Sequence, residues 1–188
     1  MAFSIYTAGN GTYEEFCAGY DPATMPFNPR PGVDGFLGKA VANEDPRARL
    51  AIANRLLDDG ADPSLVSADG DRINVLHALW GRARDRDPEA EAALIARLLD
   101  GGADINLRSP RFGLPLTMLV TDISASREYM RAAFAAVTAH SRPDLTAHVD
   151  RRRQANVGQY LAENMFGFMH DEVYAYAAAS GQDIDVIS

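Results

Sequence analysis

The chain has 188 residues, of which 47% are hydrophobic and 23% are charged, and its formal net charge is −8. These values are typical of a folded domain and argue against a largely disordered chain. The negative charge repels phosphate backbones, so it argues against nucleic-acid binding and favours a basic partner. Cys17 is the only cysteine, which excludes an intramolecular disulfide and fits a reducing cytoplasm.

The first nine residues lack the basic start and the long apolar run of a secretory signal. No stretch approaches the roughly 18 uninterrupted apolar residues expected of a transmembrane helix. We therefore expect a cytoplasmic protein that has no contact with a membrane and is a monomer on its own.

Residues 1–35 are dense in proline and glycine, with aromatic residues between them. Such a composition disfavours long helices. It predicts an irregular N-terminal arm, with one short helix around residues 14–17, that packs as a cap over the part of the chain that follows.

The strongest pattern is an internal repeat. Residues 55–65 read RLLDDGADPSL, and residues 97–107 read RLLDGGADINL, 42 positions later (97 − 55). An internal period of about 20–50 residues is typical of stacked repeat proteins. The sequence therefore predicts an architecture built from similar units rather than a single irregular core.

Each copy of the repeat ends a predicted helix. Apolar residues upstream recur at helical spacing, and Gly60 and Gly102 follow the last apolar pair, where a helix end favours a left-handed residue. The segment that follows each glycine leads out of the helix and is called the exit here. A second helix is expected after each exit. Asn74 is a suitable N-cap for one of these helices, and Pro115 suits the first turn of the other.

These residues resemble the ankyrin repeat family. The resemblance lies in Leu-Leu-Asp-x-Gly-Ala-Asp at 56–62 and 98–104, in Asn-Val-Leu-His at 74–77 and in Leu-Pro-Leu-Thr at 114–117. Extra charged residues between positions 82 and 89 lengthen the unit beyond the family's period of about 33 residues. The resemblance implies an all-α solenoid of paired helices with protruding turns.

The predicted array has about four degenerate repeats, at residues 36–68, 69–110, 111–150 and 151–188. The third unit lacks a Gly-Ala-Asp exit, whereas residues 180–184 of the fourth imitate one. Divergent end repeats are expected because they cap the stack.

No pattern for catalysis or metal binding emerges from the sequence. His77 has two interpretations, a general base or a structural residue whose ring bonds the backbone of a neighbouring turn, and the structural one is favoured. Cys17 lies near Glu14 and Glu15, which disfavour a reactive thiolate, so it is interpreted as a packed core residue. No histidine or cysteine spacing suits zinc. We expect no cofactor, no metal and no enzymatic activity.

The resemblance implies that a partner contacts the protruding turns and the inner helices. The predicted contact residues are Asp69, Asp71, Arg72, Trp80, Arg84, Arg108, Arg111 and Phe112. Arginine and large aromatic residues are enriched at protein interfaces. Trp80 is equally consistent with core packing, whereas Phe112 lies in a turn and is harder to bury.

The favoured hypothesis is a protein-binding inhibitor, most concretely an immunity protein that occludes a basic partner such as a toxin. One alternative is a scaffold that joins two proteins, with the acidic C-terminal end as its second surface. Another is an enzyme whose site the sequence does not reveal.

Overall fold

The computed structural model describes residues 5–23, 35–82, 85–121, 125–149, 155–163 and 167–186. Within these residues it contains ten helices and no strand longer than an isolated bridge. The helices are α1 (Ile5–Asn10), α2 (Tyr13–Gly19), α3 (Phe36–Val41), α4 (Pro46–Asp58), α5 (Val75–Arg82), α6 (Pro88–Asp100), α7 (Pro115–Thr121), α8 (Arg127–His140), α9 (Val157–Glu163) and α10 (His170–Ser180). The prediction of an all-helical chain is confirmed for this part of the sequence.

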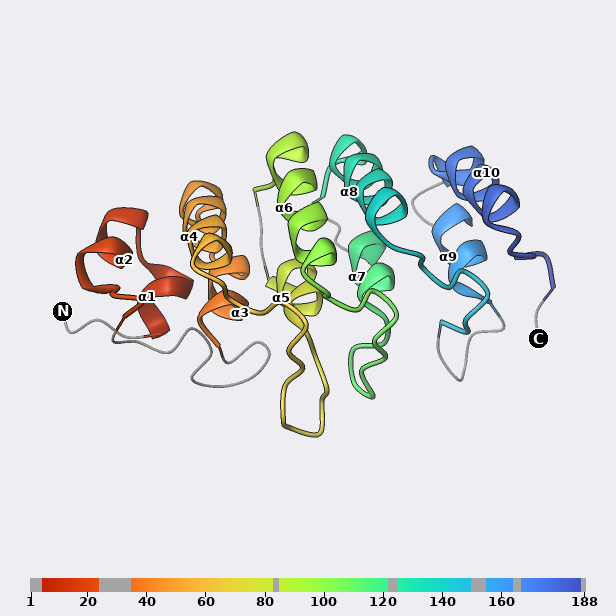
Figure 1. The fold of residues 1–188 in the computed structure, drawn as a ribbon. Coiled ribbons are helices and arrows are strands. Elements are labelled where there is room, and N and C mark those ends of the chain that lie inside the picture. Colours follow the sequence, from red (N-terminus) through yellow and green to blue (C-terminus); the bar gives the residue numbers. More distant parts are fainter. Residues whose placement is uncertain are drawn as a thin grey trace.

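The helices form pairs that stack side by side in chain order (Figure 1). An inner layer contains α1, α3, α5, α7 and α9, and each of these helices contacts the next. An outer layer contains α2, α4, α6, α8 and α10, and here α2 contacts α4, α4 contacts α6, and α6 contacts α8. Each of the four predicted units contains one helix pair.

The predicted irregular N-terminal arm is helical over most of residues 5–19: the short helix expected around residues 14–17 is confirmed as α2, whereas α1 was not predicted. These residues form the pair α1 and α2, which packs against α3 and α4. Proline and glycine oppose long helices, but these helices have only 6 and 7 residues. Thr12 and Glu15 form a capping box that starts α2, and Gly11 lies between the two helices. The predicted packing of residues 24–34 lies outside the described residues.

The outer helices α4 and α6 begin and end alike. Asp45 and Asp87 cap their first turns and are each followed by proline, which suits the first helical position. Gly60 and Gly102 follow the helix ends with φ of 93° and 97°, a left-handed conformation that glycine adopts without strain. The predicted role of both glycines is confirmed.

Four exit turns follow the outer helices α4, α6, α8 and α10. In each, an aspartate accepts a hydrogen bond from the backbone N–H two residues later, and the aspartates are Asp62, Asp104, Asp144 and Asp183. The third unit lacks the Gly-Ala-Asp sequence, as stated above, but it keeps the aspartate turn. The helix before Asp144 ends at an extended Ser141 rather than at a glycine, so the glycine signal is missing although the turn is present.

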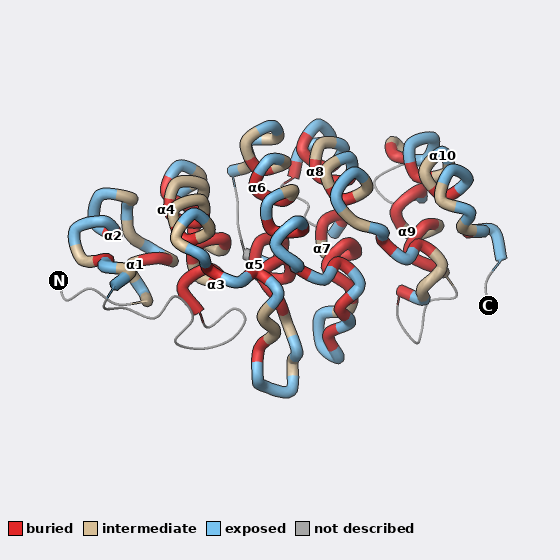
Figure 2. Tube along the Cα trace, viewed as in Figure 1, coloured by how far each residue is buried: buried red, intermediate tan, exposed pale blue. Residues whose placement is uncertain are grey.

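The core lies between the two layers and runs the length of the stack (Figure 2). It joins α1 at one end to α9 and α10 at the other. No helix in the described part of the chain has both the length and the apolar character needed to cross a membrane.

Candidate protein-binding surface

Two loops protrude beyond the inner layer, at residues 67–73 and 108–113 (Figures 1 and 2). Together we call them the loop edge. They contain Asp69, Asp71 and Arg72 in the first loop and Arg108, Arg111 and Phe112 in the second. The structure therefore brings six of the eight predicted contact residues into two neighbouring loops.

The first loop is closed by its own polar groups. The N–H of Ser67 donates to the carbonyl of Ile73 at 2.8 Å, and the N–H of Ile73 donates to Oγ of Ser67 at 2.9 Å. The carboxylate of Asp69 accepts from the Ser67 hydroxyl and from the N–H of Asp71. Asp69 is thus a turn-stabilising residue. Arg72 is exposed and has φ of 46°, in the left-handed region.

The second loop is organised around Ser109, which is 2% exposed. Ser109 and Gly113 exchange both backbone hydrogen bonds, at 2.8 and 3.0 Å. The Ser109 hydroxyl oxygen accepts from the N–H groups of Arg111 and Phe112 at 3.3 and 3.1 Å. Hydrogen bonds within the loop therefore fix the backbone of its tip.

Side chains tie the loops to one another. The Ser109 hydroxyl donates to the carbonyl of Asp71 at 2.6 Å, and Arg111 forms an ion pair with the Asp71 carboxylate at 3.3 Å. Arg108 donates to the carbonyls of His148 and Val149 in the next loop. Arg108 is thus exposed, and its guanidinium also links the second loop to residues 148 and 149.

His77 supports the second loop from below. Its Nδ1 lies 3.3 Å from the Asn74 backbone N and 2.9 Å from the Asn74 Oδ1. Its Nε2 lies 3.1 Å from the carbonyl oxygen of Gly113, which can only accept, so Nε2 carries a proton and donates to it. Burial lowers the pKa of His77, and the hydrogen bond to Gly113 opposes that shift. This geometry agrees with the structural interpretation of His77, a ring that bonds the backbone of a neighbouring turn.

The exposed end of the loop edge is formed by Phe112 and Arg111. Phe112 is 38% exposed, and the side chain of Arg111 is 69% exposed. The Arg111 guanidinium lies over the Phe112 ring at 5.0 Å, which keeps both groups together at the tip. An aromatic ring beside an arginine is a typical anchor of a protein interface.

The prediction that Trp80 contacts a partner is wrong. Trp80 is 3% exposed, and its Nε1–H donates to the hydroxyl of Tyr129 at 3.1 Å. A large ring with one polar atom is stable in a core once that atom finds an acceptor, as it does here. Arg84, the remaining predicted contact, lies outside the described residues.

Cys17 is exposed, so its interpretation as a packed core residue is also wrong. The short helix α2 directs the preceding residue, Phe16, into the core, where it stacks on Tyr20. The next position along a helix then points away from that face.

The sequence analysis missed a buried cluster of charged residues between the outer helices. Arg49 and Glu91 are both 0% exposed and form an ion pair. Arg86 donates to the other carboxylate oxygen of Glu91 at 3.0 Å. A signal exists in the sequence, because Arg49 and Glu91 are 42 positions apart (91 − 49) and occupy the same place in successive repeats. Opposite charges at equivalent helix positions predict such a pair.

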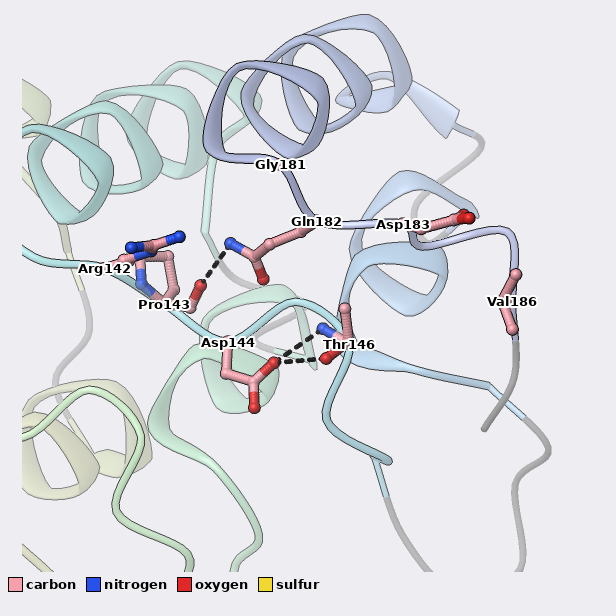
Figure 3. A pocket seen from close by; sticks show the side chains of 8 residues that line it. All are labelled: Arg142, Pro143, Asp144, Thr146, Gly181, Gln182, Asp183 and Val186. Carbon is pink, nitrogen blue, oxygen red and sulfur yellow. Dashed lines mark hydrogen bonds between the residues drawn. The ribbon is translucent and has the colours of Figure 1, made fainter.

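A pocket of about 630 Å³ lies beside the exit turns of α8 and α10 (Figure 3). Its polar groups bind one another. Gln182 donates to the carbonyl of Pro143 at 3.0 Å, and Asp144 accepts from the N–H and the hydroxyl of Thr146. The pocket therefore lies at the contact between the third and the fourth repeat unit. Among the described residues, no group of three or more potential metal ligands comes together.

No family model matches the chain, and no curated protein sequence matches it either. The fold does have a match among solved structures. The crystal structure of a functionally unknown protein from Leptotrichia buccalis superposes with a TM-score of 0.72, at 16% sequence identity, over 96% of each chain. At this identity the match shows a shared fold and says nothing of function.

Proposed function

We propose that the chain is an ankyrin-like repeat protein that binds another protein through the loop edge. The observation that supports this most strongly is the tip at Arg111 and Phe112. Its backbone is held by Ser109, Gly113 and His77, while the two side chains stay exposed. Binding to such a tip loses little conformational entropy, which favours affinity.

The ankyrin-like assignment rests on the repeated sequence at 56–62 and 98–104 together with the row of helix pairs and the protruding loops. Repeat stacks of this kind offer long surfaces to a partner rather than deep pockets. The proposed function is accordingly occlusion of a partner, most concretely by an immunity protein that inhibits a toxin.

The net charge of −8 favours a basic partner, because long-range attraction raises the rate of encounter. The loop edge itself carries three arginines and two aspartates, a local sum of +1 (3 − 2). The attraction to a basic partner therefore comes from the rest of the surface, and the loop edge supplies short-range contacts.

Affinity purification from the native cell, read by mass spectrometry, tests the proposal. The baits are the wild type, the double variant Arg111→Ala with Phe112→Ala, and a control with Arg47→Ala and Tyr6→Ala. The control removes an exposed arginine on α4 and an exposed aromatic residue on α1, both outside the two loops of the loop edge. We expect one protein to bind the wild type and the control and to be lost from the double variant. Equal recovery with all three baits would exclude the loop edge.

The inhibitor role has a separate test in living cells. Co-expression should protect a cell from a toxin encoded beside this chain, and the double variant should protect less. Protection against none of the neighbouring toxins would rule out the immunity role and leave the binding role open.

A further inference from the structure

The loop edge carries three arginines, and they differ in what their side chains bind. Both terminal nitrogens of Arg108 donate to backbone carbonyls of the next loop. Arg111 makes one contact with a carboxylate, from Nη1 to Asp71 at 3.3 Å. Arg72 is exposed, and its side chain forms no hydrogen bond or ion pair with any described residue. Arg108 is therefore engaged within the fold, whereas the other two guanidinium groups keep donors for a ligand.

The contact between Arg111 and Asp71 leaves most of the Arg111 guanidinium available. A guanidinium has five N–H donors, and a carboxylate that fully engages it usually forms two parallel bonds of about 2.7–2.9 Å. Here only Nη1 takes part, at a longer distance. Within the described part of the chain, Nε and Nη2 of Arg111 have no acceptor. Asp71 therefore orients the guanidinium without using all of its donors.

The backbone of Arg72 indicates a role for its side chain. Its φ of 46° lies in the left-handed region, which glycine and asparagine adopt more readily than arginine. The first loop is closed by Ser67 and Asp69, so the Arg72 side chain is not needed to hold it. A residue that is strained in this way, and whose side chain does not support the fold, is a candidate for function. Asp71, which precedes Arg72 and pairs with Arg111, brings the two arginines to neighbouring positions.

Phe112 adds an apolar contact to these donors. Its ring is 38% exposed, and the Arg111 guanidinium carbon lies 5.0 Å from the centre of the ring. The N–H donors of a guanidinium lie in its own plane, so a guanidinium that lies over a ring can still bind a planar anion. The loop tip thus offers cationic donors and an apolar face side by side.

The charge around the loop edge narrows the choice of ligand. The loop edge has a charge of +1, and the rest of the chain therefore sums to −9 (−8 − 1). A phosphate group carries a charge of about −1.5 to −2, so this surrounding charge repels it more strongly than it repels a carboxylate. A carboxylate also matches the planar donors of arginine. The chemistry that fits best is one carboxylate beside an apolar group.

We propose that the loop edge recognises an aspartate or glutamate side chain of the partner protein that lies next to an apolar residue. The carboxylate accepts from Arg72 and Arg111, and the apolar residue covers the exposed part of Phe112. This inference rests on the proposed function and names the contact that it uses. A partner that is basic as a whole fits this contact, because its net charge governs the encounter whereas a single carboxylate governs the binding at the loop edge.

Small peptides test this chemistry directly. The probe is N-acetyl-glutamyl-leucine amide, and the matched control is N-acetyl-glutaminyl-leucine amide, which has the same size and the same apolar side chain without the charge. Nuclear magnetic resonance of the wild type follows the backbone amides of residues 71–73 and 109–113 during each titration. We expect the glutamyl probe to shift these amides saturably and to bind at least about tenfold more tightly than the glutaminyl probe.

Variants assign the binding to the two arginines. The double variant Arg72→Gln with Arg111→Gln should lose the preference for the glutamyl probe. Arg47→Gln neutralises an exposed arginine on α4, outside the loop edge, and should bind both probes as the wild type does. Phe112→Ala should weaken the binding of both probes and keep the preference, because it removes the apolar contact alone.

The comparison of the two probes on the wild type decides the proposal even where a variant fails to fold. The proposal is overturned if both probes bind alike, if neither shifts the amides of the loop edge, or if the folded arginine variant keeps the preference. It is also overturned if N-acetyl-phosphoseryl-leucine amide binds more tightly than the glutamyl probe, because the site would then suit phosphate.

The arginine variant also separates this proposal from the proposed function. A captured partner that is lost from Arg111→Ala with Phe112→Ala, but retained by Arg72→Gln with Arg111→Gln, would support the loop edge as a binding surface and overturn the carboxylate contact. A clear preference for the glutamyl probe, with no protein captured through the loop edge, would support the carboxylate contact and overturn the proposed function.

Discussion

The loop edge and the buried charged cluster use arginines in opposite ways. At the loop edge, hydroxyl and backbone groups fix the loops, and the guanidinium of Arg111 stays largely in solvent. In the cluster, the guanidinium groups of Arg49 and Arg86 are buried on one carboxylate. The difference indicates that the exposed Arg111 side chain contributes little to stability and is available for contact. In the cluster, removing the shared carboxylate is costly because it leaves buried cations without that anion.

The largest expected effect is that of Glu91→Ala. Removing the carboxylate leaves Arg49 and Arg86 buried without their shared anion, and loss of one partner of a buried pair costs about 3–5 kcal/mol. Denaturant unfolding measures this loss. Glu89→Ala is the matched control, an exposed glutamate in the first turn of the same helix, and it should change the free energy of unfolding by less than about 0.5 kcal/mol. Similar losses for both variants would refute the role of the cluster.

Ser109→Ala is expected to have the next largest effect. It removes the acceptor of two backbone N–H groups and the donor to the Asp71 carbonyl, and unmade hydrogen bonds of a buried group cost about 1–3 kcal/mol. Hydrogen exchange at residues 109–113 should rise in this variant. Ser64→Ala, an exposed serine in an exit turn, serves as the control. Unchanged exchange at the tip would show that Ser109 does not organise it.

The pH dependence of the free energy of unfolding should show that His77 is buried in its neutral form. Burial lowers its pKa in the folded state, so the unfolded chain binds the proton more tightly. The contribution of His77 is therefore complete above the unfolded pKa of about 6.5 and is lost as the pH falls below it. Unfolding curves between pH 8 and 5 for the wild type and His77→Gln isolate this slope by difference. Parallel curves would mean that His77 is not a buried neutral residue.

Arg111→Ala should have the smallest effect on stability. The ion pair with Asp71 is exposed, and such pairs contribute about 0–1 kcal/mol. Denaturant unfolding should therefore give almost the same free energy as for the wild type. A loss above about 2 kcal/mol would place Arg111 among the residues that hold the fold together and weaken its assignment to an interface.

The repeated outer helix was the most predictable part of the fold. Gly60 and Gly102 could be predicted to end helices because glycine adopts the left-handed conformation found there. Asn74 could be predicted to cap α5, and its Oδ1 does accept from the first backbone N–H groups of that helix. The exit at Asp144 escaped prediction because its turn depends on the carboxylate alone and needs no glycine. The helix α1 was not predicted because a rule that applies to long helices was applied to a helix of 6 residues, whereas the short helix α2 was expected.

The candidate site was predictable in part. Exposed turn positions could be inferred for Arg111 and Phe112, because a residue flanked by glycine in a loop has little core to enter. The burial of Trp80 depended on an acceptor 49 positions away, the hydroxyl of Tyr129, which no local pattern reveals. The contacts of Arg86 with Glu91 and with the Tyr129 ring likewise depend on α6 and α8, which only the fold brings together.

The most direct test of the central claim is the affinity of a captured partner for the double variant Arg111→Ala with Phe112→Ala. We expect binding to weaken by roughly 30-fold or more, since truncation of central anchors costs about 2 kcal/mol or more, while the free energy of unfolding changes by less than about 1 kcal/mol. Unchanged affinity in a folded double variant would contradict the claim that the loop edge binds the partner.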